Sequence, residues 1–219
     1  FIVAGGLMSA CGVAPHALVP QLSITTWSIV HSLVAAALVL NGRYGLFETI
    51  MKSLIGLMVV TLLGSVALLG VDLAATARGL VVPTLPEGSA PSALALMGGV
   101  GGSVTLLSYG YWIREKRWSG LERLSAVRVD LAVGYALTAL FGVAMLLLAT
   151  TVLGGGDGLP GGSRGLVACA DAIGLAASER FGAGTGDTLR IVFLVGVWAA
   201  IATSTLGVWQ GVPYLFADT

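Results

Sequence analysis

Charged residues are scarce in this sequence. Only 10% of its 219 residues are Asp, Glu, Lys or Arg, whereas 56% are hydrophobic and the mean hydropathy is +0.94. Soluble domains carry about 25% charged residues, so this chain has too little polar surface to coat a soluble core. The composition excludes a soluble globular protein and predicts an all-α integral membrane protein in a lipid bilayer. The formal net charge is zero and gives no sign of a nucleic-acid partner, so we expect none.

Cysteine and catalytic motifs are also scarce. Cys11 lies in a predicted membrane span and Cys169 in a predicted loop, so we expect neither a disulfide nor a cysteine metal site. The sequence contains no P-loop, no GxSxG and no HExxH motif. We therefore expect no enzymatic activity and no cofactor.

Six apolar segments are long enough to cross a bilayer, which takes about 20 residues. They cover residues 1–20, 24–41, 49–71, 92–113, 126–153 and 190–213, and together they form one transmembrane domain, 1–219. A very short link joins the first two segments and predicts a tight antiparallel pair. The segment "VDLAATARGLVVPTLPEGSA" contains two prolines, so we expect it to be an irregular loop. We expect 154–189 to be extracellular, with a Gly-rich linker followed by a short interfacial helix.

The chain has no initiator Met and begins at Phe1, inside an apolar run. We expect an internal piece of a longer transporter; a processed small membrane protein is the alternative. Lys and Arg cluster in the short connections 42–52 and 114–128. These two loops are therefore expected to face the cytoplasm, in a plasma (cell inner) membrane protein.

Glycine, by contrast, is abundant at 32 residues. Small residues let membrane helices approach closely. This packing role is expected for Gly5, Gly6, Ser9, Gly12, Gly56 and Gly64.

The segment "GGVGGSVTLLSYGYWIREKRW" holds four glycines in five residues within a predicted span. Each costs a helix interior about 1 kcal/mol relative to Ala, so the helix is easy to unwind there. Backbone opened inside a bilayer is tolerated only where it lines a cavity or binds something, and freed carbonyls favour a cation. A continuous helix with a glycine packing face is the alternative.

This segment resembles the sixth helix of the Nramp (natural resistance-associated macrophage protein) family of divalent metal transporters, closest to its Nramp-related magnesium transporter branch. "NGRYGLFETIMKSLIGLMVV", "LERLSAVRVDLAVGYALTALFGVAMLLLAT" and "WAAIATSTLGVWQGVPYLFAD" are similar to the family's helices five, seven and eight. The resemblance implies helices three to eight of a LeuT-type inverted-repeat fold. We expect a monomer.

In typical Nramps the sixth-helix break reads Gly-Ala-Thr-Val-Met-Pro-His, where the Ala carbonyl and the Met sulfur bind metal. The resemblance places Gly102 at the Ala position and Thr105 at the Met position, with Gly101 and Ser103 as weaker candidates. A thioether favours transition metals, whereas a hydroxyl is a hard oxygen ligand. Gly102 widens the cavity for partly hydrated Mg²⁺. The predicted substrate is Mg²⁺, with Mn²⁺ as the next candidate.

The Pro-His pair is replaced by two leucines, and the first predicted span has no Asp or Glu. Intramembrane ionisable groups are the usual proton relays, so we expect alternating access without obligatory proton coupling. His16 is expected to form a hydrogen bond at the interface, and His31 to be packed and neutral. Two functional alternatives stay open: a LeuT-type transporter of an organic solute such as an amino acid, and a non-transporting membrane scaffold.

Other polar and aromatic residues have two readings each. Ser204, Thr205 and Gln210 either line the permeation path or only hydrogen-bond within and between helices. Tyr109, Tyr111 and Trp112 either shape an inner gate or anchor the interface.

Overall fold

The computed structural model describes residues 2–82, 84, 87–91, 93–94, 103–153 and 162–217. This part of the chain is helical and contains no strand, so the all-α prediction is confirmed. The elements are α1 (Ile2–Leu18), α2 (Ile24–Leu40), α3 (Tyr44–Leu69), α4 (Leu73–Val81), α6 (Ser103–Glu115), η1 (Leu121–Arg123), α7 (Leu124–Leu153), α8 (Ser163–Phe181) and α9 (Ala183–Ala217).

Three helical stretches are long and apolar enough to cross a membrane: Tyr44–Leu69, Leu121–Val152 and Gly184–Pro213. Val3–Leu18 and Ile24–Leu40 are shorter apolar helices. A helix rises 1.5 Å per residue, so the 26 residues of α3 extend about 39 Å, which exceeds the roughly 30 Å of a bilayer's hydrocarbon core. These helices make the chain an integral membrane protein.

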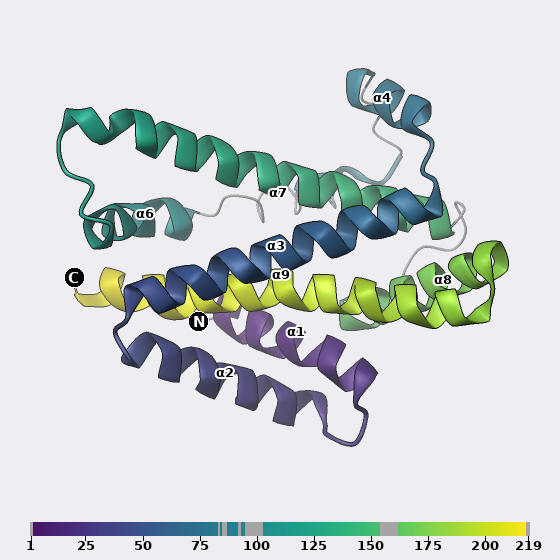
Figure 1. Cartoon of the computed structure of the whole chain (residues 1–219), viewed down its shortest axis with the longest axis horizontal. Helices are drawn as coiled ribbons and strands as arrows, with labels where there is room; N and C mark the ends of the chain where they lie inside the picture. The colour runs from purple at the N-terminus through teal and green to yellow at the C-terminus, as the bar shows by residue number, and fades with distance from the viewer. Residues whose placement is uncertain are drawn as a thin grey trace. The chain divides into compact units, whose positions relative to one another are not determined.

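The chain divides into two compact units, the first of which comprises Phe1–Val71 and Phe141–Gln210. Here α1 and α2 run side by side in opposite directions, as the short link predicts (Figure 1). The main core joins buried side chains of α1, α3, α8 and α9 with those of the second half of α7. Its fully or almost fully buried members include Ala14, Leu62, Leu148, Ile173, Phe193 and Leu194.

Gly12 lies at a close contact between α1 and α2. A Cβ built on Gly12 would meet the carbonyl oxygen of Ile24, and it would lie 2.6 Å from Ser28 Oγ. The predicted packing role of this glycine is confirmed. Within the described chain, a Cβ on Gly5 or Gly6 would meet nothing within 4 Å, and the same is true of Gly56 and Gly64. The described residues give no packing partner for these four glycines, so their packing role stays a prediction.

The helix predicted at the interface is α8, and it is more than a surface cap, because one of its faces enters the main core. Cys169 and Ile173 on that face are 2% and 0% exposed. A small-residue seam joins α8 to the first turns of α9, since a Cβ on Gly174 would lie 3.2 Å from the carbonyl oxygen of Gly186. Arg190 Nε of α9 also donates to Asp171 Oδ1 at 2.6 Å.

The end of α8 is tied to the end of α3. Arg180 Nη1 donates a hydrogen bond of 2.7 Å to the backbone oxygen of Leu69. Gly70 follows in the left-handed region with φ +69°, and a Cβ there would collide with the Arg180 guanidinium. A cation is favourable at this point because the last carbonyls of a helix carry partial negative charge.

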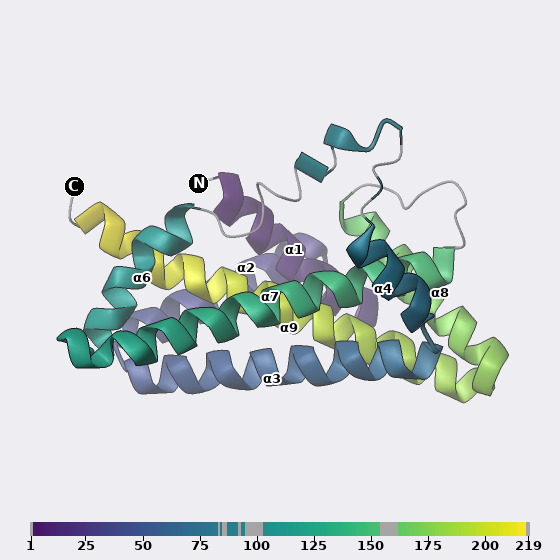
Figure 2. The same cartoon turned by 90° about the horizontal axis from the view of Figure 1, so that it is seen from above.

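The second unit comprises Asp72–Leu140 and Gly211–Thr219. The expectation of an irregular loop after residue 71 is wrong for α4 (Leu73–Val81), whose N-cap is Asp72. The Asp72 carboxylate accepts from the backbone N–H groups of Ala74 and Ala75, both at 2.9 Å. Such a cap stabilises a helix start by about 1 kcal/mol. Figure 2 shows α6 leading into α7 through the short connection that holds η1.

The remaining helix bounds differ modestly from the predicted spans. α3 already begins at Tyr44, and α9 extends from Ala183 through Pro213 to Ala217. Pro15 lies inside α1, which continues to Leu18. Most of the first half of the fourth predicted span, including its glycine-rich part, lies outside the described residues.

Candidate metal site and its surroundings

The predicted metal ligands lie at the start of α6. Gly101 and Gly102 lie outside the described residues. Ser103 and Thr105 belong to the first turn of α6, which spans Ser103–Glu115, and their backbone is helical. The first N–H groups of a helix point away from its body and make its N-terminus electropositive. A cation beside this turn therefore needs oxygen ligands, such as a hydroxyl or the carbonyls of the preceding segment.

Side-chain clusters offer no competing site in the described part of the chain. Within it, no group of three or more His, Cys, Asp or Glu side chains could hold a metal ion. Cys11 and Cys169 are free thiols, and both are buried. The glycine-rich segment and the first turn of α6 stay the candidate site.

Ser108 is a buried residue of α6 that the sequence reading did not single out. It is 2% exposed, and its hydroxyl has no hydrogen-bond partner among the described residues. A Cβ on Gly211 of α9 would lie only 2.8 Å from Ser108 Oγ and 3.8 Å from Trp112 Cζ2. The helices therefore approach closely here because position 211 has no side chain. The sequence could have indicated Ser108, because it follows Thr105 by three residues, and residues i and i+3 share one side of a helix.

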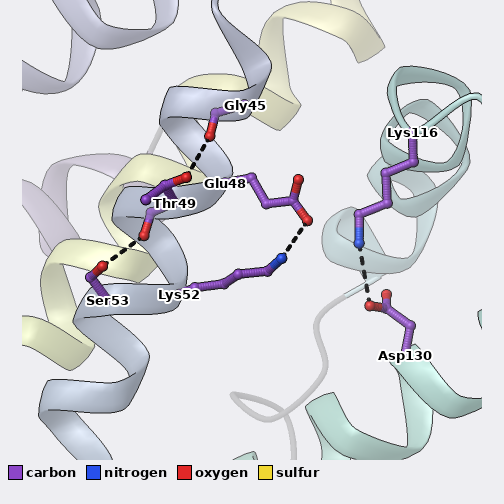
Figure 3. A network of polar contacts seen from close by, with 7 residues as sticks. All are labelled: Gly45, Glu48, Thr49, Lys52, Ser53, Lys116 and Asp130. Carbon is purple, nitrogen blue, oxygen red and sulfur yellow. Dashed lines mark hydrogen bonds and ion pairs between the residues drawn. The ribbon is translucent and has the colours of Figure 1, made fainter.

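Asp130 of α7 ties α7 to α6 through two side chains. Its Oδ2 accepts from the Tyr109 hydroxyl at 2.8 Å, and its Oδ1 lies 3.4 Å from Lys116 Nζ. Figure 3 shows the Lys116 side chain reaching this carboxylate. Tyr109 is thus a hydrogen-bond donor to α7, whereas Tyr111 lies beneath Arg114, whose Cζ is 4.5 Å from the ring centroid. These contacts hold the C-terminal end of α6, which is predicted to face the cytoplasm, against α7.

His31 forms a bridge between α2 and α9. Trp198 Nε1 donates to His31 Nε2 at 2.8 Å. Because Nε2 accepts, the ring proton resides on Nδ1, which lies 2.7 Å from the carbonyl oxygen of Trp27 and donates to it. Both ring nitrogens are used, and the imidazole is neutral in this arrangement. The prediction of a packed, neutral role for His31 agrees with this geometry.

The remaining polar candidates make mostly local hydrogen bonds. His16 Nδ1 lies 2.8 Å from the carbonyl oxygen of Leu22, which is the predicted hydrogen-bonded role. Ser204 and Thr205 donate to carbonyl oxygens in the preceding turn of α9, at 3.2 and 3.0 Å. Gln210 is buried, at 7% exposure. These local bonds favour the alternative in which the two hydroxyls only hydrogen-bond within their own helix.

Long apolar helices and scarce charge define the chain as an integral membrane protein. Residues 4–219 match the family described as natural resistance-associated macrophage protein-like, Nramp. The chain belongs to the Nramp family, and its general function is therefore the transport of divalent metal cations. Neither the comparison with curated proteins nor that with solved structures gave a match. The family resemblance drawn from the glycine-rich segment is confirmed, and the magnesium-related branch stays a prediction.

Proposed function

We propose that this protein is a secondary transporter or facilitator that prefers Mg²⁺, with Mn²⁺ as a second substrate. The observation that supports the proposal is Thr105, which lies in the first turn of α6 and which the family resemblance aligns with the metal-binding Met of typical Nramps. A hard hydroxyl in place of a soft thioether removes the preference for transition metals. Mg²⁺ keeps several waters when bound, and the absence of a side chain at Gly102 makes room for them.

The comparison with typical Nramps also bears on whether metal transport is coupled to proton movement. α1, which spans Ile2–Leu18, contains no Asp or Glu, and its basic residue is His16. His16 is engaged with a backbone carbonyl at the end of α1, and His31 is engaged at both ring nitrogens. Proton relays inside membranes use ionisable side chains that can gain and lose protons. We infer that the ion gradient and the membrane potential drive uptake without obligatory proton movement.

We also infer a LeuT-type fold with alternating access, in which broken helices move against a scaffold. The bridge from His31 to Trp198 and the seam at Gly12 both support a rigid scaffold part in the first unit. The proposed orientation places loops 42–52 and 114–128 in the cytoplasm of a plasma membrane protein, on the basis of their Lys and Arg. A monomer needs no further partner for this mechanism.

Uptake by the full-length protein in proteoliposomes tests the proposal. Mg²⁺ and Mn²⁺ influx are measured with ion-sensitive dyes, and a pH-sensitive dye is enclosed in parallel vesicles. The proposal predicts saturable Mg²⁺ influx that exceeds Mn²⁺ influx and leaves the internal pH unchanged. Metal-driven acidification of the vesicles would refute uncoupled transport. Absence of any metal flux, with the protein folded, would favour the scaffold alternative, and amino-acid flux would favour the organic-solute alternative.

A further inference from the structure

The connection between α6 and α7 carries cations that the fold itself does not use. Lys116 pairs with Asp130, and Arg114 stacks on Tyr111. The three other cations of this connection, Arg117, Arg123 and Arg128, are exposed and make no ion pair with any described residue. Residues 114–128 hold five cations and two acids, Glu115 and Glu122. A surplus of positive charge therefore faces outward from the connection.

Arg117 occupies a backbone position that normally selects glycine. Its φ is +53°, the one positive value at a non-glycine residue in the described chain. The N–H of Arg117 donates to Arg114 O at 2.9 Å, and the N–H of Trp118 donates to Ile113 O at 3.1 Å. This pair of bonds is the Schellman pattern, in which the left-handed residue is usually Gly because a Cβ is unfavourable there. A large charged residue at such a strained position points to a function of its side chain.

Apolar side chains are exposed beside these arginines. Leu121 in η1 is 87% exposed and Leu124 at the start of α7 is 43% exposed. The candidate span begins at Leu121 and contains 32 residues, which extend about 48 Å at 1.5 Å per residue. This exceeds the roughly 30 Å hydrocarbon core, so at least one end of the span extends to headgroup depth. Leucines next to arginines at that depth are typical of a segment that inserts at the membrane surface.

We propose that Arg117 and Arg123, flanking Leu121, form a docking surface for anionic phospholipid headgroups at the membrane face, with Arg128 as an additional cation. The leucine enters the acyl boundary while the guanidinium groups bind phosphate oxygens, for which their planar donor geometry is suited. The occupant is the anionic membrane surface itself, because the connection leads directly into the first residue of an apolar span. Each arginine raises the preference for anionic over zwitterionic lipid about fivefold, which corresponds to about 1 kcal/mol per cation.

A fluorophore at position 121 tests this surface in the full-length protein. Leu121→Cys is labelled with an environment-sensitive dye, while Cys11 and Cys169 are 1% and 2% exposed and react slowly. Quenching by spin-labelled phosphatidylglycerol is compared with quenching by spin-labelled phosphatidylcholine in mixed vesicles. The ratio of the two gives the local preference for anionic lipid. We expect several-fold enrichment of phosphatidylglycerol, reduced at high salt because salt screens exposed charges.

Arg117→Gly separates a lipid-binding role from a structural one. Glycine adopts a positive φ without strain, so the variant should melt at the same or a higher temperature and still lose about fivefold in phosphatidylglycerol preference. Arg123→Gln should lose a similar factor, and the matched control Arg78→Gln in α4 should lose none. An unchanged preference in Arg117→Gly and Arg123→Gln overturns the proposal. An equal loss in the control Arg78→Gln also overturns it. So does saturable binding of free inorganic phosphate to these arginines in phosphatidylcholine vesicles, because the site would then take phosphate without a lipid.

Discussion

The hydrogen bond from Trp198 to His31 joins α2 to α9 across 167 positions of sequence, at a distance of 2.8 Å. Replacing Trp198 by Phe removes the donor but keeps an aromatic ring. His31 Nε2 then loses its partner, while Nδ1 keeps its bond to the Trp27 carbonyl. Hydrogen bonds between membrane helices contribute about 0.6 kcal/mol on average and up to about 1.7 kcal/mol. A cost near 1 kcal/mol corresponds to a drop of about 2–4 °C in melting temperature for a chain of this size.

Thermal unfolding in detergent, followed with a thiol-reactive dye, measures this cost. Cys11 and Cys169 are buried free thiols, in α1 and α8 of the same unit. Burial also raises the pKa of the Cys169 thiol, which slows its reaction before unfolding. The dye signal therefore reports the loss of tertiary packing in the unit that contains the bridge.

Trp209→Phe is the matched control on the same helix. Trp209 packs against the small cluster of Ala35, Phe47 and Leu206, and no hydrogen bond of its indole is described. Trp198→Phe should therefore lower the melting temperature more than Trp209→Phe, and it should cost little when His31 is already replaced by Leu. Equal effects of the two Trp substitutions, or full additivity with His31→Leu, would refute the bridge as a stabilising contact.

Two further pairs of substitutions test the packing. Arg180→Ala should lower the melting temperature by several degrees, because a charge-assisted hydrogen bond to Leu69 O is worth about 1.5–3 kcal/mol and this one is partly exposed; Arg180→Lys should restore only part of the loss, as dye-monitored unfolding would show. Gly12→Ala should destabilise by about 1–3 kcal/mol through its collision with α2. Gly5→Ala, where the added Cβ meets nothing, should be neutral or stabilising, and the reverse order in the same melting assay would contradict the described α1–α2 contact.

Local sequence signals predicted the helices well where apolar runs were long. α2 spans Ile24–Leu40 and α7 spans Leu124–Leu153, each within two residues of the predicted bounds 24–41 and 126–153. α4 was missed because its prolines lie after the helix and not inside it. Its Asp72 cap, followed by residues compatible with a helix, was the available signal. Hydropathy also placed the beginning of α9 too late, since the first turns of this helix hold mostly small or polar residues and are helical all the same.

Tertiary contacts were less accessible from the sequence. Nothing local to His31 or Trp198 indicates that these two residues meet, because the bond depends on how α2 packs on α9. The tie from Arg180 to the end of α3 spans 111 positions and is likewise a product of packing. The residues of the candidate metal site were assigned from a sequence motif and not from geometry. The motif assigned a helix break to residues 101–107, of which 103–107 are helical in α6, while Gly101 and Gly102 lie outside the described residues.

The effect of Thr105→Met on ion selectivity tests the central claim most directly. Mg²⁺ and Mn²⁺ uptake are measured in proteoliposomes with full-length wild type, Thr105→Met and the control Thr138→Met. Thr138 is exposed on α7 and donates to the carbonyl oxygen of Gly134 in its own helix. A thioether at position 105 should shift the Mg²⁺/Mn²⁺ preference toward Mn²⁺ by roughly tenfold, or about 1.4 kcal/mol, while the control leaves the preference unchanged. An unchanged preference in Thr105→Met would contradict the assignment of this residue to the metal site.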